Sequence, residues 1–169
     1  MERPVGRFLR DEILALKSLH PNQHAYQAGK SVDTSFHQLV VRVQKALDQQ
    51  EIALGVFLHK EGAFYNTSYD SSGHHLLNME LDHTIVHWIS RLATATLGGL
   101  SRSVGVSRGC PQEGVLSPLL WCLVVDEMLA RLNEGGVYTQ GYVYDVCLPA
   151  VGKFPNTVSR LIQWALHNA

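Results

Sequence analysis

Apolar and polar positions follow two different periods along the chain, and these periods predict helices interleaved with strands. Within residues 33–50, apolar side chains recur at spacings of three and four, at Phe36, Leu39, Val40, Val43 and Leu47. That spacing is typical of an amphipathic helix with one buried face. Asp33 precedes the apolar stripe and is a candidate N-cap.

Period-two patterns and turn residues predict a small antiparallel sheet. Residues 52–58 read "IALGVFL" and are apolar on both alternating faces, which is typical of a central strand covered on both sides. The stretch "GYVYDV" (141–146) joins two expected strands, 137–142 and 146–150. It predicts a β-hairpin with Asp145 at its tip. Without further information, an aspartate at such a tip is more often a turn former than a catalytic group.

Further helices are expected at residues 82–92, 117–132 and 156–169. Asp82 can cap the first, and two glycines at positions 135 and 136 stop the second. The segment "ATATLGGLSRSVGV" predicts two short strands around Gly98 and Gly99. Because strands and helices alternate with hairpins, the expected class is α+β, with helices near 82–92 and 117–132 backing the sheet. An all-helical packing around 33–50 and 117–132 is the alternative.

Composition narrows the class of protein. The chain has 169 residues and a formal net charge of −1, so it is long enough for one domain and shows no strong electrostatic signature of nucleic-acid binding. No apolar run reaches membrane-spanning length, and the N-terminus is charged, so we expect no membrane segment. Cys110, Cys122 and Cys147 form no C-x-x-C motif and indicate buried thiols in an intracellular protein of the cytoplasm or nucleus.

Four stretches, taken together, resemble the reverse transcriptase (RNA-directed DNA polymerase) of arthropod non-LTR (LINE-type) retrotransposons. They are "HAYQAGKSVDTS" (24–35), "GVFLHKEGAFYN" (55–66), "GCPQEGVLSPLLW" (109–121) and "GYVYDV" (141–146). The resemblance implies a residual fingers segment at 1–50 and a palm-like segment at 51–169, forming one compact domain without the thumb. It also implies a degenerate, truncated copy.

The resemblance assigns chemistry to three positions. Such polymerases join a primer 3′-hydroxyl to a nucleotide α-phosphate with two Mg²⁺ ions held by three aspartates. Here His59 and Tyr144 stand at two of the aspartate positions, and Asp145 is the surviving one. Two divalent cations about 4 Å apart repel by roughly 17 kcal/mol at an effective dielectric of about 20, and one carboxylate offsets too little of that. We therefore expect no productive Mg²⁺ binding and no polymerisation.

The resemblance also implies contacts to nucleotide and template. Phe64 matches a steric gate, Gln112 a residue near the template, and Arg108 and Lys30 candidate phosphate ligands. Read without the family, these are ordinary core, turn and surface residues. The pairs His20/His24 and His83/His87 have helical spacing but no third ligand, so we expect solvated histidines rather than a zinc site.

Three hypotheses about function follow. The first is a reverse-transcriptase fragment without catalysis. The second is a module that retains binding to RNA or protein; the family binds an RNA/DNA template-primer, but the few dispersed basic residues here predict weak or no nucleic-acid binding. The third is that the fragment, with exposed sheet edges and apolar patches, has no stable fold.

Overall fold

The structure is a computed structural model that describes residues 2–59, 81–91, 95–96, 103–104 and 116–169. The chain forms two compact units. The first contains residues 1–19 and 62–124, and the second contains residues 20–61 and 125–169. The predicted division into fingers and palm near residue 50 rests on the family resemblance rather than on compactness, and it stays a prediction.

The first unit is largely helical in its described parts. The N-terminal segment runs through α1 (Glu2–Phe8), the π-helical turn η1 (Leu9–Ile13) and α2 (Leu14–Leu16). Helix α6 (His83–Arg91) is capped by Asp82, whose Oδ1 accepts a hydrogen bond of 2.7 Å from the backbone N–H of Thr84. Hydrogen bonds from the Thr84 side chain and from its backbone N–H hold the pKa of the Asp82 carboxyl below its ordinary value.

Two strands of this unit confirm the predicted strand pair, whereas Gly98 and Gly99, expected at its turn, lie outside the described residues. Strand β2 (Ala95–Thr96) pairs antiparallel with β3 (Ser103–Val104). None of the helices in the described ranges is both long enough and apolar enough to cross a bilayer.

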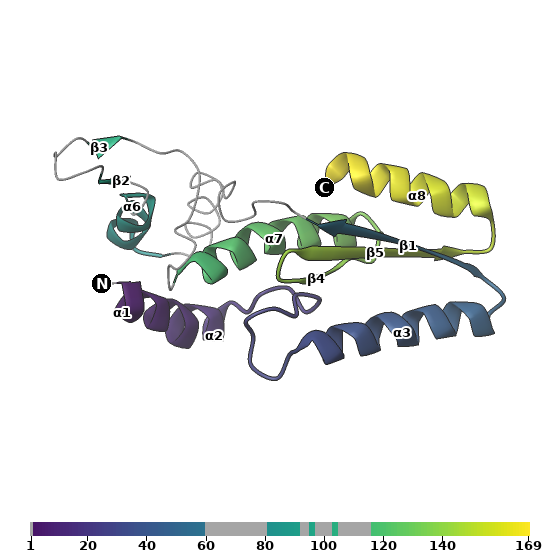
Figure 1. The fold of residues 1–169 in the computed structure, drawn as a ribbon, viewed down its shortest axis with the longest axis horizontal. Coiled ribbons are helices and arrows are strands. Elements are labelled where there is room, and N and C mark those ends of the chain that lie inside the picture. Colours follow the sequence, from purple (N-terminus) through teal and green to yellow (C-terminus); the bar gives the residue numbers. More distant parts are fainter. Residues whose placement is uncertain (1, 60–80, 92–94, 97–102, 105–115) are drawn as a thin grey trace. The chain divides into compact units, whose positions relative to one another are not determined.

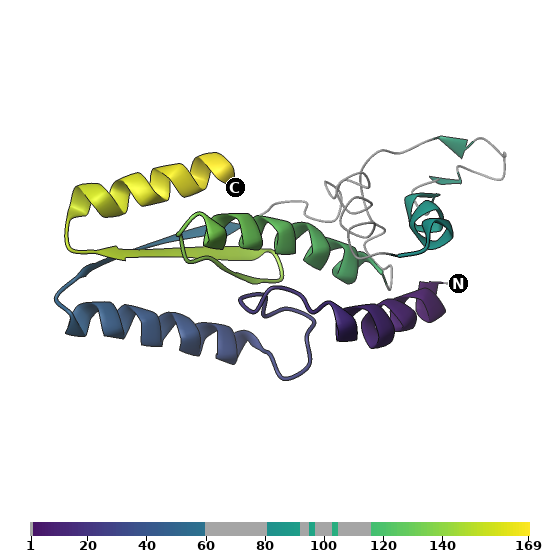
Figure 2. The same cartoon turned by 180° about the vertical axis from the view of Figure 1, so that it is seen from behind.

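The second unit is built on a three-stranded antiparallel sheet in the order β1-β5-β4. The strands are β1 (Ile52–His59), β4 (Gln140–Tyr142) and β5 (Asp145–Gly152), which confirms the predicted α+β class and its three strands. Helix α3 (Val32–Asp48) lies on one side of the sheet and α8 (Pro155–Asn168) on the other (Figures 1 and 2). The expected helix at 82–92 is α6, which belongs to the first unit.

The prediction that residues 52–58 form a central strand is wrong. The central strand is β5, in which residues 146–150 are all buried, and β1 lies at the edge. Ile52 is 40% exposed, Leu54 41% and Phe57 67%. A run that is apolar on both faces can therefore also form an edge strand with apolar side chains in solvent.

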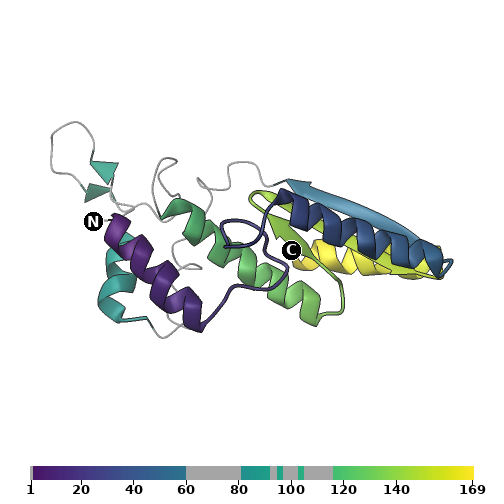
Figure 3. The same ribbon diagram turned by 90° about the horizontal axis from the view of Figure 1, so that it is seen from below.

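Helix α3 runs alongside β1 (Figure 3) and begins earlier than predicted. Its N-cap is Ser31, not Asp33: the backbone N–H of Thr34 donates to Ser31 Oγ, and the backbone N–H of Ser31 donates to Thr34 Oγ1. This capping box fixes the helix start. The residues facing the sheet include the small, buried Ser35 and Ala46, whereas Phe36 and other members of the predicted stripe are exposed.

Helix α7 (Ser117–Glu134) ends at the two glycines, as predicted. The backbone N–H of Val137 donates to Leu132 O and that of Gly136 to Asn133 O, with Gly136 at a φ of +83°. These two bonds form a Schellman motif, which requires a residue in the left-handed region. The second half of α7 packs on β4. A Cβ added to Gly141 of β4 would lie 3.2 Å from Val125 Cγ1 of α7.

The loop at residues 20–31 closes the outer edge of β4. The backbone N–H of His24 donates to Gly141 O at 2.8 Å, and the N–H of Gly141 donates to Asn22 O at 3.0 Å. The Asn22 side chain also donates to Asn133 Oδ1 and to Thr139 O. The loop and β4 are thus joined by backbone and side-chain bonds.

Candidate functional site

The hairpin between β4 and β5 brings the candidate catalytic positions to the end of β1. Tyr142 pairs with Asp145 across the hairpin, which leaves Val143 and Tyr144 as a two-residue turn. On the other side of β5, Asp145 pairs with His59, the last residue of β1. The register alone therefore places His59 and Asp145 next to each other.

Their side chains interact directly. His59 Nδ1 lies 2.8 Å from Asp145 Oδ1. A carboxylate can only accept, so Nδ1 carries the proton and donates. The two side chains are 64% and 62% exposed, and the ring of Tyr144 meets that of His59 edge-on with centroids 6.5 Å apart. The three positions singled out from the sequence thus form one cluster, in which His59 and Asp145 are exposed and Tyr144 is half-buried.

The turn is strained. Val143 has a φ of +53°, in the left-handed region that β-branched residues rarely adopt. Such a conformation costs about 1–3 kcal/mol and persists only where the surrounding structure imposes it. Here the paired strands on both sides of the two-residue turn impose it.

The cluster does not fit a pair of Mg²⁺ ions. Mg²⁺ prefers oxygen ligands in octahedral geometry, whereas this site offers one carboxylate, one imidazole and one phenol. One oxygen of that carboxylate already accepts the hydrogen bond from His59. Across the described residues, no group of three or more His, Cys, Asp or Glu side chains is arranged to hold a metal ion.

Of the predicted nucleotide and template contacts, only Lys30 lies in the described part of the chain. Its Nζ donates to Gln23 O at 2.8 Å and to Pro21 O, so its ammonium group holds the loop at 20–31 together. Burial lowers the pKa of Lys30. Phe64, Arg108 and Gln112 lie outside the described residues.

The first histidine pair differs from the expectation that it is solvated. His24 is only 3% exposed; its Nδ1 lies 3.1 Å from Thr34 Oγ1 and its Nε2 lies 2.9 Å from Gln38 Oε1. Burial lowers its pKa, opposed by the hydrogen bond to Gln38. His20 instead accepts at Nδ1 from the backbone N–H of Asn22, so the two rings serve different partners.

The remaining predicted groups are simpler. His83 and His87 are exposed on α6, as expected. Cys122 and Cys147 are buried thiols, and burial raises the pKa of Cys147 to about 11. Cys110 lies outside the described residues.

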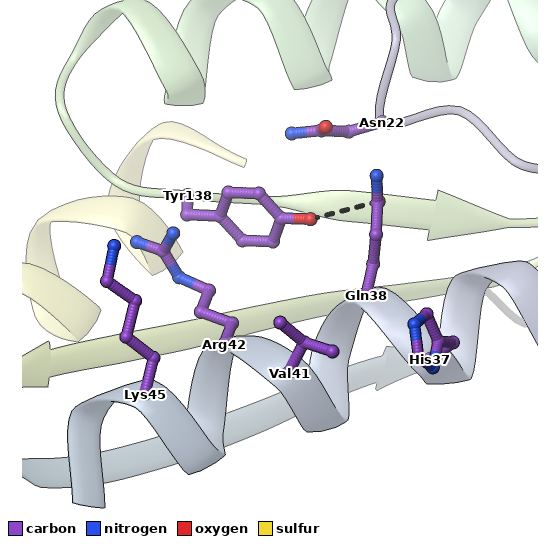
Figure 4. Close-up of a pocket in the computed structure, with 7 residues that line it drawn as sticks. All are labelled: Asn22, His37, Gln38, Val41, Arg42, Lys45 and Tyr138. Atoms are coloured by element: carbon purple, nitrogen blue, oxygen red, sulfur yellow. Dashed lines mark hydrogen bonds between the residues drawn. The ribbon is translucent and has the colours of Figure 1, made fainter. Parts of the chain in front are cut away.

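Sequence reasoning missed a pocket between α3 and the segment before β4. Its volume is about 470 Å³, and its side chains come from α3, from the loop at 20–31 and from the residue two positions before β4 (Figure 4). The lining residues are Asn22, His37, Gln38, Val41, Arg42, Lys45 and Tyr138. The signal in the sequence was faint: two cations three positions apart on one helix.

Comparison with known proteins gives two findings. Residues 3–163 match the family described as reverse transcriptase (RNA-dependent DNA polymerase). The chain is also 25% identical, over 114 residues, to a 115 kDa protein of the type-1 retrotransposable element R1DM of Drosophila melanogaster. That match covers 66% of this chain but only 11% of the relative, so the chain spans a small part of that protein's length.

Proposed function

Because the chain belongs to the reverse transcriptase (RNA-dependent DNA polymerase) family, and resembles that of an arthropod LINE-type element, we propose that it is a polymerase domain without catalytic activity. The observation that carries the proposal is the hydrogen bond between His59 and Asp145. It stands where the family resemblance implies two metal-binding aspartates.

Charge supports the proposal. The cluster carries at most one negative charge, from Asp145, in place of the three that the family's aspartates would supply. Since two Mg²⁺ ions at a reaction centre repel by roughly 17 kcal/mol at an effective dielectric of about 20, the missing carboxylates remove the main protein contribution to holding them. Both side chains are largely exposed, so solvent and salt screen the remaining charge, and burial does not strengthen its attraction for a cation.

Primer extension on an RNA template in Mg²⁺ tests the proposal directly. We expect the chain to extend the primer no faster than its Asp145→Ala variant. Mg²⁺-dependent extension that disappears in Asp145→Ala would contradict the proposal.

A second measurement tests the stated cause. Mn²⁺ binding, followed by electron paramagnetic resonance, should be weak in the chain and at least about tenfold tighter in the double variant His59→Asp, Tyr144→Asp, since two carboxylates are added beside Asp145. The matched control adds the same charge elsewhere, through Ser159→Asp and Gln163→Asp at exposed positions of α8. Equal gains in both double variants would show that the hairpin position is irrelevant.

The second candidate is a domain that keeps binding without catalysis. The observation that favours it is the cationic pocket against α3, which shares no lining residue with the hairpin cluster. Its ligand is argued separately below.

A further inference from the structure

The pocket beside α3 gathers positive charge, and no acidic residue lines it. Arg42, Lys45 and His37 are among its seven lining residues, and none of the seven is acidic. Within the described residues, neither Arg42 nor Lys45 takes part in an ion pair. The pocket therefore presents a local positive potential on a chain whose formal net charge is −1.

Arg42 is held in place but not neutralised. Its guanidinium carbon lies 4.1 Å from the centre of the Tyr138 ring, a cation–π contact. Its Nε is buried and has no hydrogen-bond partner among the described atoms. A cation–π contact offsets only part of the free energy that removing a guanidinium from water costs. An anion at the guanidinium would supply the missing compensation.

The neighbours of Arg42 fix the shape of the pocket. The hydroxyl of Tyr138 donates to Gln140 Oε1 at 3.0 Å and lies 3.3 Å from Gln38 Oε1 (Figure 4). Gln140 in turn donates from Nε2 to Ser35 O and Oγ, both at 2.9 Å. The ring under Arg42 is thus anchored to α3 and β4, so the guanidinium is presented from a rigid base.

The spacing of the two cations suits a phosphate. Side chains three positions apart on a helix have Cβ atoms about 5–6 Å apart, so Arg42 and Lys45 can both reach one group lying over α3. Arginine offers a planar fork of N–H donors and lysine a point charge. A single carboxylate is satisfied by the arginine fork alone, whereas a phosphate has further oxygens for the ammonium group.

We propose that this pocket binds a phosphate ester through Arg42 and Lys45. The site does not depend on whether the hairpin is active, because the two share no residue. The phosphate can belong to a nucleic-acid strand or to a free nucleotide, and the experiment below separates these sources.

The test is fluorescence anisotropy of a short fluorescein-labelled oligouridylate, in EDTA and at low salt so that the hairpin cannot contribute through metal. We expect Lys45→Gln to raise Kd by about three- to tenfold, and Arg42→Gln by about tenfold or more. Each change should also lower the slope of log Kd against log salt concentration by about one, because about one counterion fewer is released on binding. Lys45 is exposed, so Lys45→Gln tests the site without disturbing the packing around Arg42.

The matched control is Arg160→Gln, which removes one exposed cation from α8. It should leave Kd nearly unchanged. If Arg160→Gln weakens binding as much as Lys45→Gln does, or if neither pocket variant weakens it, the proposal is overturned.

Competition identifies the source. Displacement of the labelled strand by ADP supports a free phosphate ester as ligand, and displacement only by unlabelled oligouridylate supports a strand. Binding of an acidic peptide in the pocket, with no binding of either phosphate compound, would overturn the proposal in favour of a carboxylate ligand. Primer extension is not measured in this experiment, so its outcome is independent of the polymerase question.

Discussion

At the scale of single residues, His59 changes what the hairpin can bind. An aspartate at its position would repel Asp145, and a divalent cation between them would be the natural way to relieve that repulsion. The imidazole instead donates a hydrogen bond of 2.8 Å to Asp145 and satisfies the carboxylate without a metal. Under the proposed function, one substitution therefore removes a ligand and also gives the remaining ligand a different partner.

His24 makes the second unit sensitive to acid. Burial lowers its pKa below the ordinary value for histidine of about 6.5, and Lys30 adds to this effect, while the hydrogen bond to Gln38 opposes it. The unfolded chain then takes up a proton at higher pH than the folded chain does. Stability is therefore complete above about pH 6.5 and is lost as the pH falls below that value toward the lowered pKa of the folded state.

Thermal melts at about pH 7.5 and about pH 5.5 check this prediction. The melting temperature should fall on acidification. In His24→Gln it should fall less, because the buried titrating group is gone. His20 has a pKa lowered by burial as well, so part of the dependence should remain. The control His37→Gln, at an exposed position on α3, should keep the full dependence. An unchanged pH response in His24→Gln would contradict the assignment.

At the scale of elements, the sequence predicted features with short-range patterns better than features that depend on tertiary packing. The strands were found because the hairpin turn and the buried run at residues 146–150 have short-range signatures. Three side chains of the candidate site came together because a sheet register connects His59 to Asp145, and the family motifs marked both positions. These features needed no knowledge of the packing.

What the sequence could not supply was which apolar face meets a neighbour. The stripe of α3 that contains Phe36 is exposed because Ser35 and Ala46, smaller residues, let the helix lie close to the sheet. The pocket was missed for the same reason, since it depends on Tyr138 meeting Gln38, 100 positions away. Contacts of that separation leave no period in the sequence.

The junction of α7 with α8 gives a prediction at this scale. The Trp164 ring of α8 lies against Gly135, where an added Cβ would clash with Trp164 Cη2. Gly135→Ala should therefore destabilise the chain by about 1–3 kcal/mol, as overpacking does. Chemical denaturation measures the loss, and a shift in tryptophan emission should accompany it.

A double-mutant cycle separates this contact from a backbone effect. In the Trp164→Leu background, Gly135→Ala should cost clearly less, because the ring is gone. Gly136→Ala serves as the comparison: its Cβ would meet nothing within 4 Å, but its φ of +83° strains any side chain, so its cost should be the same in both backgrounds. Equal costs of Gly135→Ala in both backgrounds would rule out the contact.

At the scale of the whole molecule, β1 is the feature that most affects behaviour in solution. In the described part of the chain it has a strand partner on one side only, and it carries neither charge nor proline before His59. Edge strands of this kind pair with other copies unless a charge or proline prevents it. We therefore expect the chain to self-associate, and this bears on whether it can be studied as a monomer.

Sedimentation velocity across a concentration series tests that expectation with Phe57→Lys. Phe57 is 67% exposed on β1, so the substitution removes an apolar contact, adds charge beside the edge and leaves the core intact. It should shift the distribution toward monomer and raise the concentration for half-association by about tenfold. Phe154→Lys is the matched control, since Phe154 is 69% exposed but precedes α8 rather than lying on the edge. If both variants suppress association equally, general hydrophobicity rather than strand pairing is the cause, and a wild-type chain that stays monomeric throughout the series would remove the premise.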